Sequence, residues 1–427
     1  MPVRRILIGV TFTLSMLLYV DRIAISTAQS PINGEFGLSD TQFGWILSAF
    51  ALGYALFQTP AGIVADRYGP RVVIAAIVAL WSLFTLATGL AWGFVSLLVF
   101  RFLFGAAEAG AYPSVARTFY SWLPTGERGL AQGINFSGSR LGAAFALPVV
   151  AWLVTSVGWR MAFFILGAIG IVWAFGWYVW FRNTPEEHPG VTAPELALIE
   201  AGREAERASE AGALPLRLGD LGRSRNMWLV MGQYFASNFT FFFCLTWLFP
   251  YLQRTYDLGA VQAGFFASAP LIAGAIGNWV GGAMVDSIYR SGRLRMSRQL
   301  PAMLGFSLAA IGLLGSLQFD DPVFAVLFLS IAIFGADMTL PPSWAFCIDI
   351  GRSHAGTVSG TMNMAGNLGS FVTSLAFPYL MVITGSTNLF FLVGAALNII
   401  AVFLWWRTDA TRPITPTGVA NPAVGAM

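Results

Sequence analysis

The sequence has little charge, few cysteines and histidines, and no lysine. Only 11% of its 427 residues are charged, whereas 56% are hydrophobic and the mean hydropathy is +0.68. Soluble domains carry about 25% charged residues, so the composition excludes an ordinary soluble protein. Successive apolar runs of about 20 residues, each long enough to cross a bilayer, predict a helical membrane protein with many spans.

The scarcity of cysteine and histidine excludes further classes. Cys244 and Cys347 both fall inside apolar runs, so they indicate neither a disulfide framework nor metal ligands. His188 and His354 stand in loops without a catalytic triad, a phosphate-binding loop or paired catalytic acids. The sequence therefore predicts no enzyme, no metal and no cofactor. The net charge of +3 lies mostly in short loops between spans, so it does not indicate nucleic-acid binding.

Twelve apolar runs are expected to span the bilayer. Their approximate bounds are 5–27, 41–65, 72–91, 94–118, 131–155, 160–181, 227–251, 262–285, 299–317, 322–346, 356–384 and 388–407. The first run follows basic residues as in a signal peptide, but it carries Asp21 and Arg22 and no convincing cleavage site, so we expect it to be retained. The fold class predicted is an all-α membrane protein.

The spans divide into two groups of six around one long polar stretch. We expect an N-terminal six-helix bundle over 1–181, a central cytoplasmic loop over 182–226, a C-terminal six-helix bundle over 227–407 and a disordered cytoplasmic tail over 408–427. The charged run Glu200 to Glu210 in the loop is either a short amphipathic surface helix or a solvated linker.

The arginines set the orientation. With the N-terminus inside, nearly all loop arginines are cytoplasmic, and only Arg160 and Arg254 lie outside. The reverse topology would invert this bias, so the positive-inside rule predicts that both termini are cytoplasmic.

The two halves of the chain repeat one another. Gly129-Leu-Ala-Gln-Gly133 aligns with Gly356-Thr-Val-Ser-Gly360, and Gly62-x-x-x-Asp66 has an echo in Gly282-x-x-x-Asp286. Two related six-span halves are typical of a transporter that binds its substrate between them.

Several ionisable residues lie at membrane depth, where charge is costly and usually functional. Arg101 and Glu108 are seven positions apart and project from one helical face, about 10 Å apart along the axis. They either serve transport or form an internal ion pair that locks neighbouring helices. Arg140 lies in the middle of a Gly/Ser-rich span and indicates either an anionic ligand or a helix-packing contact. Asp337, which precedes Pro341-Pro342, is either functional or only a partner of Arg140 or of a backbone donor.

Near the outer end of the first span, Arg22 stands next to Asp21, so the two cannot share one helical face. They either border a cavity or form an interfacial pair at the end of the span. Uncharged polar residues in the spans are individually more often helix-packing groups than ligand contacts, but together they could recognise the hydroxyl groups of a polyhydroxy acid. These candidates are Tyr19, Tyr54, Asn238, Ser343, Asn363 and Asn367.

The loop after the second span carries a family signature. Gly62-x-x-x-Asp66-Arg67-x-Gly69-x-Arg71 resembles the signature of the major facilitator superfamily, and with twelve spans and a half repeat the resemblance covers nearly the whole chain. It implies the major facilitator fold of two pseudo-symmetric six-helix bundles. It also implies that this loop docks across the halves as a gate and does not bind substrate.

Within that superfamily the chain is similar to the anion:cation symporters. The similarity rests on Tyr19-x-Asp21-Arg22, Tyr54, Arg101 with Glu108, the stretch Gly335 to Trp344, and Asn363-x-x-x-Asn367. It implies proton-coupled import of an organic anion, most typically a sugar acid such as an aldonate, aldarate or hexuronate. In the sugar-acid members the first-span acid and the fourth-span glutamate carry protons, here Asp21 and Glu108. The neighbouring arginines and the aromatic and amide groups hold the substrate.

The partners expected are therefore a small organic anion, protons and the lipid bilayer. The chain is expected to be a monomer in the bacterial inner membrane. Carriage of another small carboxylate, such as an aromatic or dicarboxylic acid, remains an alternative. Export of hydrophobic cations would require buried acids without matching arginines. A membrane sensor of this fold would bind ligand without transport, and an integral-membrane enzyme lacks a catalytic constellation.

Overall fold

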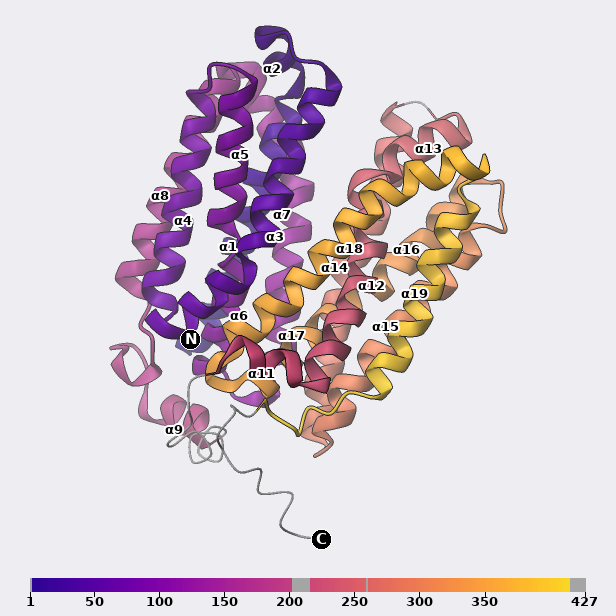
Figure 1. The fold of residues 1–427 in the computed structure, drawn as a ribbon. Helices are drawn as coiled ribbons and strands as arrows, with labels where there is room; N and C mark the ends of the chain where they lie inside the picture. The colour runs from indigo at the N-terminus through magenta and orange to yellow at the C-terminus, as the bar shows by residue number, and fades with distance from the viewer. Residues whose placement is uncertain (1, 202–215, 259, 415–427) are drawn as a thin grey trace.

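The computed structural model describes residues 2–201, 216–258 and 260–414, which form helices and no strand (Figure 1). The N-terminal half contains these α-helices, two of them short: α1 (Val3–Thr27), α2 (Gln29–Phe36), α3 (Asp40–Tyr68), α4 (Pro70–Gly89), α5 (Phe94–Glu108), α6 (Ala111–Trp122), α7 (Arg128–Val157) and α8 (Trp159–Trp180). The loop between the halves contains α9 (Ala193–Ala201) and α11 (Leu218–Arg223).

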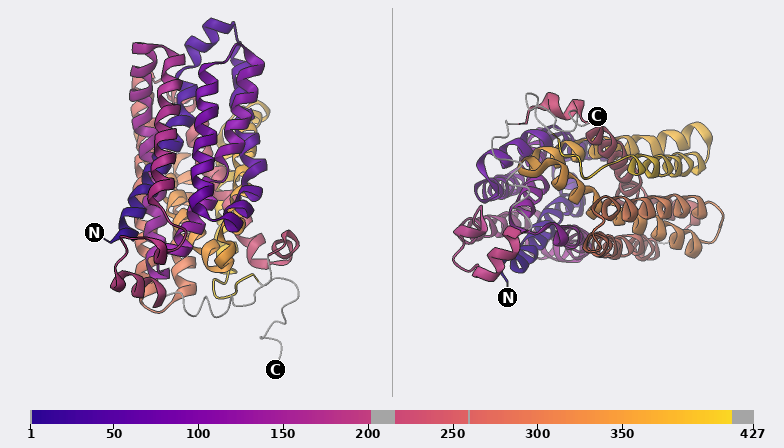
Figure 2. Two further views of the ribbon diagram at one scale, coloured as in Figure 1. Left: turned by 90° about the vertical axis from the view of Figure 1, so that its left-hand side faces the viewer. Right: turned by 90° about the horizontal axis from the view of Figure 1, so that it is seen from below.

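The C-terminal half follows the same plan. Its helices are α12 (Arg225–Thr246), α13 (Leu248–Tyr256), α14 (Ala260–Arg290), α15 (Leu294–Ser316), α16 (Pro322–Met338), α17 (Leu340–Gly351), α18 (Ala355–Thr384) and α19 (Asn388–Trp406). Figures 1 and 2 show α1–α8 gathered in one bundle and α12–α19 in a second, with the start of α1 and the end of α19 at the same end of the molecule.

Membrane-spanning character is visible in the helices. Within the described residues, nine helical stretches are long and apolar enough to cross a bilayer, and one of them extends from α16 into α18. The count of twelve spans and the cytoplasmic position of the termini stay predictions.

Two spans that we expected to be single helices are broken. The fourth, expected over 94–118, ends one helix at Glu108 and starts the next at Ala111. The tenth, expected over 322–346, is interrupted at Thr339. Pro341 and Pro342 account for the second break, because they remove backbone donors from the first turn of α17. The two breaks stand at corresponding places in the halves, and such interrupted spans often border a transporter's binding site.

At the end where α1 starts and α19 ends, the halves are joined by Asp66. Its carboxylate accepts hydrogen bonds from the backbone N–H groups of Gly356 (2.9 Å) and Thr357 (2.7 Å) and from the Thr357 hydroxyl (2.5 Å). These groups open α18, where the helix dipole favours an anion. Gly62 permits the approach, since a Cβ there would collide with the Gly356 carbonyl. The contact closes this end of the molecule.

Asp286 makes the matching contact from the other half. It accepts hydrogen bonds from the N–H groups of Gly129 (2.9 Å) and Leu130 (2.8 Å) at the start of α7. A Cβ on Gly282 would lie 2.7 Å from the Gly129 carbonyl oxygen, so α14 and α7 also cross closely. We call these two contacts the Asp66 clamp and the Asp286 clamp.

The loops and the tail hold more structure than expected. The polar loop after the first span contains α2, and the central loop contains α9 and α11, whereas most of the charged run 200–210 lies outside the described residues. The expectation of a disordered tail is wrong for 408–414, because Asn226 donates to two carbonyl oxygens of this segment and the Ile414 N–H donates to Ile350. Residues 415–427 lie outside the described residues.

Candidate functional site

A cavity of about 70 Å³ lies between the two bundles. Eight residues expected to bind substrate line it, from both halves: Tyr19, Arg22, Tyr54, Arg140, Asn238, Asp337, Asn363 and Asn367. Aromatic residues make up much of the remaining wall: Tyr112, Phe136, Tyr234, Phe241, Phe242 and Trp344. The site is thus a small aromatic chamber with a few charged groups.

Arg140 and Asp337 face each other across the boundary of the halves. The Arg140 Nε donates to Asp337 Oδ2 at 2.8 Å and its Nη2 donates to Oδ1 at 2.6 Å, so the pair is bidentate. The guanidinium carbon lies 3.6 Å from the centre of the Phe241 ring, and Nη1 donates to the Tyr19 hydroxyl at 3.4 Å. Both members of the pair are almost fully buried. The structure therefore shows Asp337 as the partner of Arg140.

Glu108 pairs with Arg22. The Arg22 Nε donates to Glu108 Oε1 at 2.8 Å, and the Arg22 guanidinium lies against the rings of Tyr19, Phe50 and Tyr54, with centroid distances of 5.0, 5.0 and 4.4 Å. Glu108 Oε2 is buried and has no hydrogen-bond partner among the described residues. An acid with one bonded and one unbonded oxygen is suited to exchanging a proton.

The alternative of an Arg101–Glu108 ion pair is wrong for this structure, because two helical turns separate the residues and Glu108 turns to Arg22. Arg101 is 3% exposed and forms no hydrogen bond or ion pair with the described residues, and its Nε is buried without a partner. Its guanidinium carbon lies 5.1 Å from the Phe50 centroid and 4.5 Å from the Phe104 centroid.

Phe50 thus lies between two arginines. Both Arg22 and Arg101 contact its ring, yet Glu108 is paired with Arg22 alone. A ring face attracts cations only modestly, so the contacts with Phe50 and Phe104 offset little of the positive charge of Arg101. An anion is therefore still attracted to it. Arg101 does not line the 70 Å³ cavity itself; it stands one aromatic ring away from it.

Asp21 points away from Arg22, as adjacent helical residues must. It is 1% exposed, and its Oδ2 accepts a hydrogen bond from Trp81 Nε1 of α4 at 3.0 Å. Its Oδ1 is buried and has no partner in the described part of the chain. Asp21 is therefore a second buried acid with an unused oxygen.

The amide candidates are held by short contacts. Asn363 Nδ2 donates to Gln58 Oε1 at 2.8 Å across the halves, Asn367 Nδ2 donates to the Asn363 carbonyl at 2.8 Å, and Asn238 Nδ2 donates to the Tyr234 carbonyl at 3.0 Å. These bonds orient the side chains around the cavity.

Ser343 differs from the other uncharged candidates. It is fully buried and does not line the cavity, and its hydroxyl donates to the Thr339 carbonyl at 2.6 Å. Its bond lies within the C-terminal half, so the structure gives Ser343 a helix-packing contact and no access to the cavity.

The remaining gate-motif residues lie at the closed end, away from the cavity. Arg67 contacts the Tyr68 ring, and Arg71 Nε donates to the Tyr178 carbonyl at 3.0 Å. Gly69 has a φ of 79° and starts α4, a left-handed conformation that favours glycine. These contacts fix the turn that carries Asp66.

Sequence reasoning missed several residues that shape the site. Phe50 lies one helical turn before Tyr54 and stacks on it with a centroid distance of 5.6 Å, a spacing that could have pointed to it. Trp81, Gln58 and Phe241 carried no such signal, because their importance depends on which helices are neighbours. In the described residues, no group of three His, Cys, Asp or Glu side chains could hold a metal.

Comparison with known proteins shows the family to which the chain belongs. The model of the Major Facilitator Superfamily matches residues 11–374. "Probable sulfoacetate transporter SauU" of Cupriavidus necator is 37% identical over 402 residues, 92% of this chain and 91% of that protein. "Probable galactarate/D-glucarate transporter GudP" of Escherichia coli is 32% identical, covering 88% and 87%. A solved proton:xylose symporter XylE has a TM-score of 0.72 at 16% identity, covering 96% of each chain. The expected family and fold are confirmed.

Proposed function

Because the chain belongs to the Major Facilitator Superfamily, we propose that it imports an organic anion together with protons by alternating access. It is a multi-pass protein of the inner membrane and a transporter, not an enzyme. The substrate class that we favour is a sugar acid. The relatives named for glucarate and galactarate transport support this class, as do the amides Asn238, Asn363 and Asn367 around the cavity.

One observation carries the proposal: Arg101 is a buried arginine that forms no hydrogen bond or ion pair with a carboxylate among the described residues. An arginine does not neutralise itself by losing a proton, so an uncompensated one at membrane depth attracts an anion. A substrate carboxylate can meet it with two parallel hydrogen bonds.

Protonation and anion binding then share an electrostatic cause. The central region holds Arg22, Arg101 and Arg140 against Asp21, Glu108 and Asp337. When Glu108 takes up a proton, Arg22 loses its counter-charge, and two neighbouring arginines on either side of Phe50 are left for the substrate. Proton release from Glu108 on the other side of the membrane restores the Arg22 pair and expels the anion.

The Arg140–Asp337 pair gives this charge exchange a mechanical consequence. The Asp337 carboxylate of the C-terminal half already accepts two hydrogen bonds from the Arg140 guanidinium, as a substrate carboxylate would. The cavity of about 70 Å³ is far below the roughly 300 Å³ at which ligand pockets begin, so a sugar acid must displace side chains to enter. Displacement of Asp337 both widens the cavity and separates the halves at its centre.

A second candidate substrate is a smaller dianion. The 37% identity with the protein named for sulfoacetate transport favours it, and the small cavity is compatible with such a ligand. Both candidate substrates require the same arginines. They differ in that only a sugar acid has several hydroxyl groups for the amides to bind.

The experiment measures uptake and binding in proteoliposomes. We expect a sugar acid, or failing that sulfoacetate, to be taken up against its gradient when the lumen is alkaline, while the uncharged sugar or lactone is not. Affinity should rise as the pH falls from about 8 to about 6, because protonation of Glu108 removes the counter-charge of Arg22 and leaves that arginine for the anion. Equal binding of an acid and its neutral analogue would contradict the proposal. Binding without flux would indicate a sensor of this fold.

A further inference from the structure

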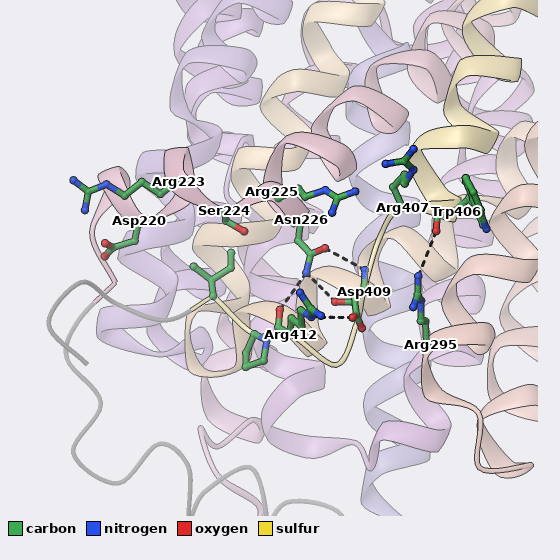
Figure 3. A pocket seen from close by; sticks show the side chains of 12 residues that line it. Asp220, Arg223, Ser224, Arg225, Asn226, Arg295, Trp406, Arg407, Asp409 and Arg412 are labelled. Atoms are coloured by element: carbon green, nitrogen blue, oxygen red, sulfur yellow. Dashed lines mark hydrogen bonds and ion pairs between the residues drawn. The ribbon is translucent and has the colours of Figure 1, made fainter. Parts of the chain in front are cut away.

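A second, larger pocket lies at the end of the molecule where α1 starts and α19 ends. Its volume is about 520 Å³, against about 70 Å³ for the central cavity, and the two pockets share no lining residue. It forms where α11, the start of α12, the start of α15 and the end of α19 meet the segment 407–414 (Figure 3). The transport mechanism proposed above does not use it.

The pocket has a surplus of positive charge. Arginines at 223, 225, 295, 407 and 412 line it, against the carboxylates Asp220 and Asp409. Both carboxylates are already engaged: Asp220 accepts from the Arg217 N–H at 2.9 Å, and Asp409 pairs with Arg412 at 3.1 Å. Burial raises the pKa of Asp409, but hydrogen bonds from Thr411 and the charges of Arg295 and Arg412 together outweigh it and keep the pKa below its ordinary value. Asp409 is thus engaged by its own loop and by Arg295.

Arg225 and Arg407 are the available cations. In the described residues neither pairs with a carboxylate, although Arg407 lies over its neighbour Trp406 with a centroid distance of 5.3 Å. Figure 3 shows Arg225 extending towards the end of α19, where Arg407 lies, whereas Arg223 points the other way. Arg295 adds a third cation, which donates to the Trp406 carbonyl at 3.5 Å.

The floor of the pocket is held in place by hydrogen bonds. The buried Asn226 side chain donates to the carbonyls of Asp409 (2.8 Å) and Arg412 (3.1 Å), and its oxygen accepts from the Asp409 N–H at 3.1 Å. The buried Gln299 donates to three carbonyls of the α19 end, including Thr408 at 2.8 Å. These bonds fix the chain that carries Arg407, so its position is set before any ligand arrives.

The orientation of the protein in the membrane does not by itself account for a pocket lined by arginines. The positive-inside rule requires arginines at this end of the molecule but leaves them free to pair. Several arginines at this end do pair: Arg4 contacts Glu127 (2.9 Å) and Glu195 (3.5 Å), and Arg298 contacts Asp349 (2.7 Å). Arg225 and Arg407, by contrast, line a common pocket without a carboxylate partner among the described residues.

The pocket also lies at a suitable depth for lipid. Trp406 and Trp228, at the ends of α19 and α12, are 57% and 61% exposed. Exposed tryptophans at helix ends prefer the headgroup region of a bilayer. The arginines next to them are then at the level of the lipid phosphates, where juxtamembrane basic groups attract anionic lipid.

We propose that this pocket binds a phosphate group, held by Arg225, Arg295 and Arg407 beside the first turn of α12. An arginine fork matches phosphate oxygens in pairs, and the helix dipole at the start of α12 adds to the attraction. Two sources offer this chemistry, an anionic lipid headgroup and free inorganic phosphate. The position of the tryptophans favours the lipid.

The test uses delipidated full-length protein in detergent. Its thermal midpoint is followed during titration with short-chain phosphatidylglycerol, phosphatidylcholine of the same chain length, and inorganic phosphate. We expect saturable stabilisation by phosphatidylglycerol, little by phosphatidylcholine, and weakening of the apparent affinity by at least about tenfold in Arg225→Gln/Arg407→Gln, since two charge-assisted hydrogen-bond donors are lost. A response to inorganic phosphate equal to that of phosphatidylglycerol, and lost in the same variant, identifies free phosphate as the source.

The matched control is Arg293→Gln, an exposed arginine near the start of α15 that does not line the pocket. It should respond like the wild type. The proposal is overturned if neither phosphatidylglycerol nor phosphate stabilises the wild type, if the double variant keeps the full response, or if the control loses as much. Should the double variant fail to fold, each single variant is titrated, and a response unchanged from wild type in both overturns the proposal equally.

Discussion

The two halves of the molecule differ most at the central cavity and least at the closed end. At the closed end Asp66 and Asp286 make the same contact with the start of the opposite half's helix, in the register of the internal repeat. At the cavity the arginines come from the N-terminal half, and the C-terminal half contributes the single carboxylate Asp337 and three amides, within the described residues.

This difference indicates a division of tasks. Gating needs two equivalent contacts that open together. The same contact, made once by Asp66 and once by Asp286, meets this need. Binding and proton exchange need charges of unequal kind, so one half holds Arg101 and Glu108 while the other supplies Asp337 as a removable counter-charge. We expect the variants below to separate these tasks.

Arg101→Lys should reduce uptake of the anion by at least about tenfold although the charge is kept, because an ammonium group cannot provide the planar fork that meets a carboxylate at two points. Uptake is measured in proteoliposomes at saturating proton gradient. Arg293→Lys, at an exposed position, should leave uptake unchanged. Normal uptake by Arg101→Lys would show that no bidentate contact is made there.

Glu108→Gln should abolish uphill uptake while leaving exchange of substrate across the membrane largely intact. The amide cannot carry a proton, yet it retains an oxygen that can accept the Arg22 hydrogen bond. Counterflow with equal pH on both sides measures exchange, and a pH-driven assay measures uphill uptake. If binding and both modes of transport fall together, Glu108 is a structural partner of Arg22 and not a proton carrier.

Part of this site could be predicted from the sequence, because helix periodicity and membrane depth single out ionisable residues one at a time. Arg140 and Asp337 were found in this way, and their pairing was one of the alternatives left open. The Arg22–Glu108 pair was not found, since it depends on how α1 and α5 lie relative to one another in space. Phe50 and Phe241 were missed among 36 phenylalanines, because the sequence does not show which rings contact an arginine.

The fold was more predictable than the site. Apolar run length placed the ends of α18 and α19 within a residue of the structure. Gly110 and Pro113 mark the break after Glu108, but it was missed because the run remains apolar through both residues. The ordered segment 408–414 was missed because its order comes from Asn226, almost two hundred residues earlier in the chain.

Asp337→Asn should tighten anion binding several-fold and slow the transport cycle. Removing the carboxylate leaves Arg140 buried without its counter-charge, which costs about 3–5 kcal/mol of stability. The substrate can then restore the pair, so the thermal shift on adding substrate should be larger than in the wild type. Arg140→Gln should show the opposite, weaker binding and a smaller shift. A shift in Asp337→Asn that is no larger than that of the wild type would mean that substrate and Asp337 do not compete for Arg140.

The smallest effects are expected at the two clamps, where Asp66→Asn and Asp286→Asn should slow transport and leave substrate affinity unchanged. Each loses the attraction between a carboxylate and a helix start, about 0.3–1 kcal/mol, which corresponds to a rate change of about two- to fivefold. Asp66 accepts an additional hydrogen bond from the Thr357 hydroxyl and lies 3.8 Å from Arg117, whereas hydrogen bonds reach the Asp286 carboxylate from two backbone N–H groups.

The Asp66 clamp should therefore be the more sensitive of the two, and the double variant should be slower than either single variant, since both contacts hold the same end closed. Maximal rate and half-saturation concentration are measured together for all three variants. A sharp loss of affinity in a folded Asp66→Asn protein would place this residue in the binding pathway. Equal rates in the two single variants would mean that the Thr357 hydroxyl and Arg117 add nothing to the clamp, and that the repeat makes the two halves equivalent at this end in energy as well as in geometry.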